Sequence, residues 1–285
     1  MMADETPGAG SPGRVVLHIE SGPSSPLALK AAVRIASALR GVIEVLVVEN
    51  QELLDLAELP FAREISRSGR IMRPLDSAAI QRDIHNLAQS VFRQVEEMAQ
   101  AAEVALQSRV VRARPAEALA RVCRECAEEH FVALGEPLSG HSLDKLRQLF
   151  EVSEAARGLV VVGPRGSRLS GPVAILIEDV QHVDDLVATA SRLMPAIGTS
   201  IIAVVLGKPG AELRALEDAT RKRVARLPEV RVTATPASSD SEAIEVLRRL
   251  EAGLVISRFG GMTTASNEAL SALASALECP LLLVR

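Results

Sequence analysis

The strongest constraint on the fold is an alternation of strand-like and helix-like segments that runs through the chain twice. Short runs rich in Val, Ile and Leu alternate with longer segments in which apolar residues recur every three or four positions. The first pattern is typical of strands buried on both faces, and the second is typical of amphipathic helices. The alternation therefore predicts βαβ units around a parallel sheet that is covered by helices on both faces.

Each half of the chain contains five predicted strands and the helices that connect them. In the first half, strands are expected at residues 15–19, 43–48, 106–111, 131–134 and 159–162, and helices at 26–39, 77–103, 115–129 and 143–156. In the second half, strands are expected at 173–177, 200–206, 230–235, 254–257 and 281–284, and helices at 183–197, 212–227, 241–250 and 265–277. The predicted class is α/β, with two tandem doubly wound, Rossmann-like domains, each built on a five-stranded parallel sheet.

A segment rich in Gly, Pro and Ser separates the two halves, and a similar composition marks the start of the chain. We predict a disordered leader at residues 1–13, a first domain at 14–164, a linker at 165–171 and a second domain at 172–285. The leader lacks the basic and apolar stretches of a secretory signal. Gly41 is expected to end the first helix in the left-handed conformation, which costs glycine little.

The composition argues against several classes of function. The formal net charge is −4 and the chain has no Trp or Tyr, so it offers neither a broad positive field nor the usual stacking platforms for nucleic acid. No stretch approaches the roughly 20 apolar residues of a membrane span. Three cysteines do not make a disulfide framework, and this favours a reducing, cytoplasmic location. The motifs of serine hydrolases, zinc proteases and P-loop enzymes do not occur, so we expect no enzyme, and neither nucleic acid nor membrane as a partner.

Three sequence features, which occur in the order given below, resemble those of the universal stress protein family. The first strand of each half ends in an acid, Glu20 or Glu178; residues 114–119 read Arg-Pro-Ala-Glu-Ala-Leu; and residues 279–285 read Cys-Pro-Leu-Leu-Leu-Val-Arg. The resemblance covers residues 14–285 and implies a bacterial regulatory protein with a role in stress. It also implies an internal pseudo-dimer, in which the strands at 159–162 and 281–284 meet across a pseudo-twofold axis. Whether the chain also forms a homo-oligomer stays open.

ATP-binding members of that family carry Gly-x-x-Gly, nine residues and then Gly-Ser or Gly-Thr after the fourth strand, with an Asp at the end of the first strand. In the first half Gly135 follows the strand, but the family's spacing places Leu138 at the second glycine. It also places Gln-Leu, residues 148–149, where the family has Gly-Ser or Gly-Thr. Glu136 adds a negative charge where phosphate would lie, and Pro137 lacks an N–H donor. We therefore expect the first half to have lost the family's ATP site.

The loop at residues 258–267 in the second half retains more of what an anion site needs. It offers a cation, two glycines, several hydroxyls and a helix N-terminus, although Asn-Glu replaces Gly-Ser at 267–268. The candidate binding residues are Arg258, Gly260, Gly261, Thr263, Thr264 and Ser266, together with Glu178, Glu20 and Gly135.

Two interpretations of these residues stay open. In the first, the loop binds a small anion or a nucleotide such as ATP or AMP, and the strand-end glutamates accept a hydrogen bond from a ribose. In the second, Thr264 or Ser266 caps a helix, the glycines form a tight turn, and Glu20 and Glu178 are solvated acids at the open end of the sheet.

Three further features of the first half bear on function. Cys123, Cys126 and His130 share the spacing of one helix face, but no second pair of ligands would complete a metal site, so small buried residues and a surface histidine are expected. Residues 53–61 form an apolar segment that begins at Leu53 and ends at Phe61; it either packs on its own domain, covers it as a lid or docks a protein partner. The basic stretch at 63–73 is expected to be solvated.

Three functions are compatible with the sequence. The first is a non-enzymatic regulatory protein that binds a partner or a small ligand through the second half. The second is a nucleotide binder with slow ATP hydrolysis, and the third is a scaffold subunit of a larger assembly.

Overall fold

The computed structural model of the chain describes residues 13–20, 24–66, 68–70, 72–126, 129–136, 148, 150–151 and 154–285. Most of the expected leader and most of the helix expected at 143–156 lie outside these residues. Pro137, Leu138 and Leu149 also lie outside them.

The described elements follow the predicted order closely. The first half consists of β1 (Arg14–Ile19), α1 (Pro26–Ala38), β2 (Val42–Asn50), α2 (Gln51–Ala57), β3 (Arg63–Ile65), β4 (Met72–Pro74), α3 (Ser77–Ala101), β5 (Ala105–Ala113), α4 (Pro115–Glu125), β6 (His130–Leu134) and β7 (Gly158–Val161). The second half consists of β8 (Gly171–Ile177), α6 (Val183–Ile197), β9 (Gly198–Gly207), α7 (Ala211–Val224), β10 (Val230–Pro236), α8 (Asp240–Arg249), β11 (Leu254–Arg258), α9 (Asn267–Ala276) and β12 (Leu281–Val284). Short 3-10 turns precede α6 and α9, at Val180–His182 and Met262–Thr264.

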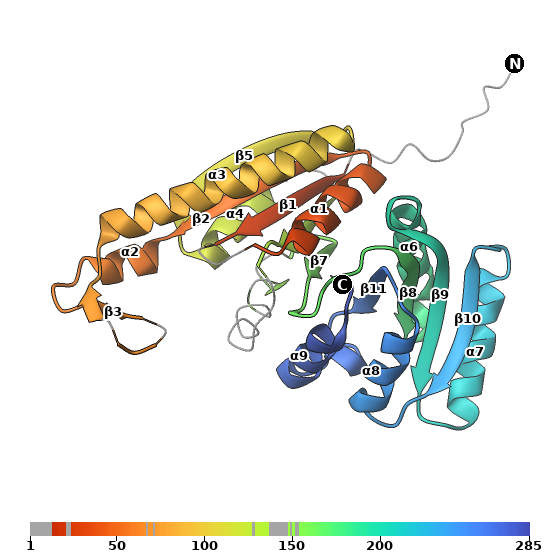
Figure 1. Cartoon of the computed structure of the whole chain (residues 1–285). Helices are drawn as coiled ribbons and strands as arrows, with labels where there is room; N and C mark the ends of the chain where they lie inside the picture. Colours follow the sequence, from red (N-terminus) through yellow and green to blue (C-terminus); the bar gives the residue numbers. More distant parts are fainter. Residues whose placement is uncertain are drawn as a thin grey trace, which may run out of the picture.

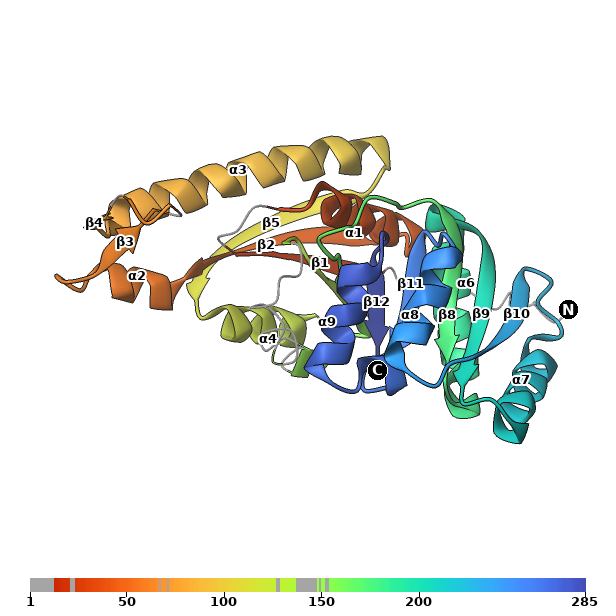
Figure 2. The same cartoon turned by 60° about the horizontal axis from the view of Figure 1, so that its bottom comes forward.

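One mostly parallel sheet runs through both halves (Figure 1, Figure 2). Its strand order is β10-β9-β8-β11-β12-β7-β6-β1-β2-β5, so each half repeats the order third, second, first, fourth, fifth. The two five-stranded layers join where β12 pairs with β7 in the antiparallel direction, with Leu282 opposite Val160. The predicted meeting of the fifth strands is therefore confirmed, and the two layers form a single sheet because of it.

Side chains alternate between two hydrophobic cores, one on each face of the sheet. On β1, for example, Val15 and Leu17 belong to the core under α1, α3, α6 and α7, whereas Val16 belongs to the core under α4, α8 and α9. This period of two is that of a strand buried on both faces. The predicted α/β class with helices on both faces is thus confirmed.

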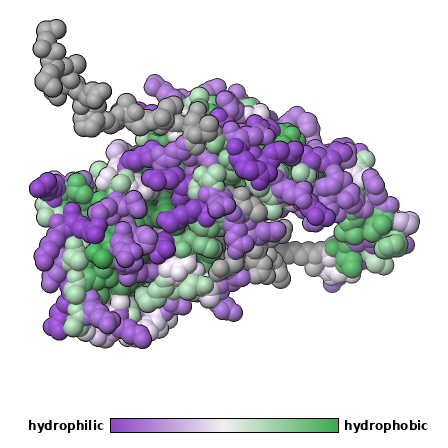
Figure 3. Space-filling model, turned by 180° about the vertical axis from the view of Figure 1, so that it is seen from behind, coloured by the Kyte–Doolittle hydropathy of each residue, from purple (hydrophilic) through white to green (hydrophobic). Residues whose placement is uncertain are grey.

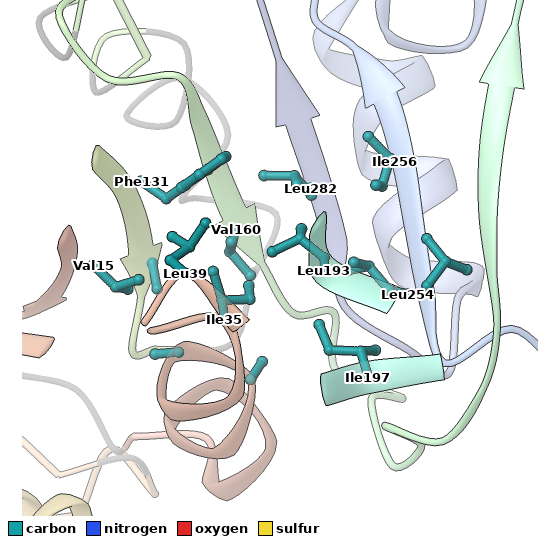
Figure 4. Packing of buried hydrophobic residues seen from close by; sticks show 14 of the residues in the cluster. Val15, Ile35, Leu39, Phe131, Val160, Leu193, Ile197, Leu254, Ile256 and Leu282 are labelled. Atoms are coloured by element: carbon teal, nitrogen blue, oxygen red, sulfur yellow. The ribbon is translucent and has the colours of Figure 1, made fainter. Parts of the chain in front are cut away.

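The core under α1 and α6 continues from one half into the other. Helix α1 packs against α6, and Ile35 and Leu39 lie near Leu193 and Ile197 across the seam (Figure 4). Leu282 of β12 belongs to the same cluster (Figure 4). The two halves therefore share buried apolar surface, and the domain boundaries at residues 164 and 172 stay a prediction.

The prediction for Gly41 was wrong. Arg40, not Gly41, adopts the left-handed conformation after α1, with φ of 49°. Gly41 is needed for a different reason, because a Cβ atom there would collide with the backbone carbonyl of Gly13. That carbonyl accepts a hydrogen bond from the N–H of Val42 (3.0 Å), which ties the start of β2 to the start of β1.

The connection between β2 and α3 contains structure that the sequence interpretation did not predict. Asn50 caps α2 by accepting a hydrogen bond from the N–H of Glu52 (3.0 Å), and Leu54 and Ala57 are buried. Beyond α2 the chain projects from the body as the two-stranded ribbon β3–β4 (Figure 1). We call the described residues of the range 56–74 the arm. The expected packing of residues 53–61 on their own half thus holds for the buried face of α2 only.

Candidate functional site

The candidate site lies at the carboxyl ends of β8 and β11. These strands are neighbours in the sheet, yet the chain leaves β8 for α6 on one face and leaves β11 for α9 on the other. Such a divergence opens a crevice at the strand ends, which is where open α/β sheets bind ligands. Glu178 follows β8 and the loop at 259–266 follows β11, so the structure brings together the predicted residues of the second half.

The carboxylate of Glu178 occupies the cradle that the loop forms. The N–H of Met262 donates to Oε2 of Glu178 (2.6 Å), and the N–H of Thr263 donates to Oε1 (3.0 Å). The hydroxyl of Thr263 donates to the same oxygen (3.1 Å). Successive amides that point at one anion are the geometry of a phosphate-binding nest, and here the anion belongs to the chain itself. Neither sequence interpretation of Glu178, as a ribose ligand or as a solvated acid, describes this arrangement.

The glycines of the loop allow this close approach. A Cβ atom on Gly261 would collide with the carboxylate of Glu178. Gly260 has φ of 79°, in the left-handed region that glycine adopts without strain. Both glycines therefore shape the loop around Glu178.

The loop hydroxyls are also engaged. Thr264 is buried and its hydroxyl donates to the carbonyl of Arg258 (2.6 Å). The hydroxyl of Ser266 accepts a hydrogen bond from the N–H of Ala269 (3.1 Å) and caps α9. The capping interpretation is confirmed for Ser266, and not for Thr264.

Arg258 supplies a cation at the mouth of the site. Its side chain is exposed and, within the described residues, makes no ion pair. The next residue, Phe259, stacks on Phe150 with ring centroids 3.9 Å apart, and the guanidinium of Arg285 lies 4.2 Å from the centre of the Phe150 ring. Burial lowers the pKa of Arg285 from its usual range. This stack fixes the start of the loop against the end of the chain.

The corresponding position in the first half has a different structure. The N–H of Gly135 donates to the carbonyl of His18 (2.9 Å), and the carbonyl of Gly135 accepts from the N–H of Ser25 (2.7 Å). A Cβ atom on Gly135 would collide with the side chain of Ile19. Gly135 therefore joins the end of β1 to the start of α1, and its amide is not available to a phosphate.

Glu20 lines a small acidic cavity at the carboxyl ends of β1 and β2. The cavity has a volume of about 230 Å³. Its charged lining consists of Glu20, Glu52, Glu117 and Arg114, with Asn50 and Gln148 as polar neighbours. Arg114 forms ion pairs with Glu52 (3.2 Å) and Glu117 (3.8 Å). Three carboxylates against one guanidinium disfavour a phosphate group here. Sequence reasoning missed this cavity, because its residues come from three separate strand ends.

The cysteines and His130 do not form a metal site. Helix α4 ends at Glu125, four residues before the predicted end, because Cys126 has an extended backbone. His130 consequently opens β6 and is buried, so the expected surface histidine was wrong. Burial raises the pKa of the Cys123 thiol to about 12. Among the residues that the structure describes, no three potential ligands cluster as a metal site would require.

Comparison with solved structures identifies the fold. A universal stress protein from Archaeoglobus fulgidus DSM 4304 superposes with a TM-score of 0.62 at 13% identity, covering 95% of this chain and 96% of that one. A structure from Pseudomonas aeruginosa UCBPP-PA14 that carries the universal stress protein name gives 0.56 at 15% identity, covering 95% and 92%. The chain has the fold of universal stress proteins.

The same fold also builds part of a transporter. The cytoplasmic domain of a prokaryotic cation chloride cotransporter superposes with a TM-score of 0.55 at 11% identity, covering 96% of this chain and 95% of that one. No protein-family model and no curated protein matches the sequence. Within the described part of the chain, no helix is long and apolar enough to cross a bilayer. The universal stress protein fold thus serves proteins of different roles, and the function has to be argued from the site.

Proposed function

We propose that this chain is a universal stress-type regulatory protein that acts by binding rather than by catalysis, and that its second-half anion cradle is closed by Glu178. The observation that carries the proposal is the set of three hydrogen bonds from Met262 and Thr263 to this carboxylate. Three free cysteines, two of them buried, agree with a cytoplasmic location.

A phosphate group would need the donors that Glu178 already uses. A tethered group has an effective concentration in the millimolar range, so a nucleotide at a lower concentration competes poorly for the same amides. The hydroxyls of Thr263 and Thr264 are both engaged within the site, which gives them a structural role rather than that of nucleophiles. Both points favour a protein that is not an ATPase.

Calorimetric titration with ATP and with inorganic phosphate tests this proposal. We expect no measurable binding to the wild type and binding to Glu178→Ala, because that change vacates the amides. Glu20→Ala is the matched control, since it removes the equivalent acid of the first half and leaves the cradle filled. Tight ATP binding by the wild type that is lost in Arg258→Ala would contradict the closed cradle.

A nucleotide-regulated protein is the second candidate, and the exposed guanidinium of Arg258 favours it. An anion such as ATP or AMP that pairs with Arg258 would take over the amides of Met262 and Thr263 and release Glu178. Mass spectrometry after gentle denaturation of the purified protein separates the candidates. Released ATP, ADP or AMP would favour the nucleotide-regulated protein, with slow hydrolysis as a further step to assay.

A scaffold subunit is the third candidate. The exposed side chains of Leu56, Leu59 and Phe61 favour it, because they place an apolar surface outside the body of the protein. The cotransporter domain with the same fold is an example of this architecture within a larger protein. Under this candidate the segment from Leu53 to Phe61 docks a protein partner.

A further inference from the structure

Exposed apolar side chains are concentrated on the arm. Seven large hydrophobic side chains are exposed among the described residues, and five of them lie in the arm. These five are Phe61 (74% exposed), Ile65 (65%), Met72 (61%), Leu56 (48%) and Leu59 (41%). Figure 3 shows hydrophobic side chains gathered at this projecting end of the molecule. Single exposed hydrophobic residues are ordinary, but a contiguous group on a projection marks an interaction site.

The ribbon β3–β4 has one charged face and one mixed face that carries two large apolar side chains. Ile65 lies opposite Met72, and Glu64 lies opposite Arg73, with which it forms an ion pair. Because side chains alternate along a strand, the pair Ile65 and Met72 points to the face opposite the ion pair, which it shares with Arg63 and Pro74. A two-stranded ribbon with uncovered apolar side chains is marginally stable in water, and further strands or a packing partner stabilise it.

The exposed apolar area of the arm suits a protein interface of modest size. At roughly 200 Å² for a large side chain, the five exposed fractions correspond to on the order of 600 Å². A standard interface buries about 800 Å² on each partner. The arm alone thus offers most of the surface that a stable dimer needs.

We propose that the arm docks the arm of a second copy of this chain around a twofold axis. A twofold contact places the same patch on both sides, and an apolar face is complementary to itself. The fifth-strand edges are already paired inside the chain, β7 with β12, so a second copy has to associate elsewhere.

Net charge opposes a contact between the bodies more strongly than a contact between the arms. In the sequence, residues 56–74 include four arginines against two glutamates, a net charge of +2, which leaves −6 on the rest of a chain whose total is −4. Two bodies of net charge −6 repel each other more strongly than two arms of net charge +2, and contact through projecting arms keeps the bodies apart. This proposal deepens the scaffold candidate and does not depend on the state of Glu178.

Sedimentation velocity over a concentration series tests the arm dimer. We expect the wild type to sediment as two chains, and the double variant Phe61→Ser, Ile65→Ser to raise the dissociation constant at least about a hundredfold, because each change acts on both sides of the twofold axis. Val110→Ser is the matched control, since Val110 is similarly exposed (60%) but lies on the edge strand β5. It should leave the dimer intact.

Hydrogen exchange of the wild type provides a measurement without substitutions. Amides of residues 61–74 should be protected at high protein concentration and lose that protection on dilution. A wild type that stays monomeric at all concentrations would overturn the proposal. A dimer that the double variant leaves unchanged, while its thermal melt shows that it is folded, would overturn it as well. Either result would leave the closed cradle of Glu178 untouched.

Discussion

In each half of the sheet an acid follows the first strand, but the two carboxylates have different surroundings. Glu178 turns into the loop after β11 and is bound by two amides and a hydroxyl. Glu20 lines an acidic cavity, and the amide of Gly135 donates to the carbonyl of His18. The comparison shows that strand order places an acid at the crevice, whereas the loop that faces it decides what the acid does.

The largest expected effect is a difference in protein stability between the variants that remove Glu178 and Glu20. Glu178→Ala should lower the free energy of unfolding by about 2 to 3 kcal/mol, because it removes charge-assisted hydrogen bonds and leaves their donors without the carboxylate. Glu20→Ala should stay within about 0.5 kcal/mol, as expected for an acid that lines an open cavity. Urea unfolding of both variants measures the difference, and equal losses would show that the two sites do not differ in this way.

A double-mutant cycle measures the coupling between Gly261 and Glu178. Gly261→Ala should cost about 2 kcal/mol, because the added methyl group expels the carboxylate of Glu178 and so removes the same hydrogen bonds. In the Glu178→Ala background the same change should cost much less, which gives a coupling of about 1 to 2 kcal/mol. Gly260→Ala is the control. The added methyl group contacts no atom of the site. The change should lower the free energy of unfolding by about 1 kcal/mol in either background, because the residue has a positive φ. Additive losses for Gly261→Ala and Glu178→Ala would contradict the proposed contact.

A smaller effect concerns the acid that links the two halves. Glu129 precedes β6 and bonds Arg157 (2.8 Å) and Arg192 of α6 (2.6 Å). Burial raises the pKa of Glu129, but the hydrogen bond from Arg192 and the charges of both arginines outweigh it and leave the pKa below its usual value. The folded state therefore gains stability above the unfolded pKa, near 4.3, and loses it as the pH falls through the lower folded value.

The variant Glu129→Gln should accordingly be about 1 kcal/mol less stable than the wild type at pH 7 and indistinguishable from it at strongly acid pH. Thermal melts across this range provide the measurement. Glu278, a more exposed acid that pairs with Arg168 (3.1 Å), serves as a reference, because Glu278→Gln should change stability less. A constant difference at all pH values would show that Glu129 contributes by packing and not by charge.

Much of the fold could be predicted, because both of its periodicities are visible in the sequence. Strands buried on both faces require apolar runs, and the ten strands of the sheet fall within a few residues of the predicted positions. Local rules failed where tertiary contacts decided the outcome. Arg40, and not the adjacent Gly41, adopts the left-handed conformation. Gly41 instead lies where a Cβ atom would collide with the Gly13 carbonyl. The arm was missed as a structure because its strands are only three residues long.

The sequence predicted that Glu178 and the loop residues after β11 lie together, but it predicted neither their arrangement nor the part of Met262, whose amide binds the carboxylate. The order of the strands brings Glu178 to Gly261 and Thr263, and that follows from the repeat and the resemblance. The inward turn of Glu178 depends on the amide directions of Met262 and Thr263. Amide directions follow from backbone torsion angles that no sequence pattern here specifies. A longer acid at the strand end, together with a Gly-Gly-x-Thr loop, is the signal that could have indicated a filled cradle.

The antiparallel junction of β7 with β12 has a consequence for how the two sites can differ. In a dimer of identical chains, every substitution alters both crevices at once, and the pairing of the edge strands depends on protein concentration. Here the two partners are covalently continuous, so their association survives any dilution. The site of the second half can therefore be filled by the carboxylate of Glu178 while the cavity beside Glu20 stays open. Substitutions in either site leave the pairing of β7 with β12 intact.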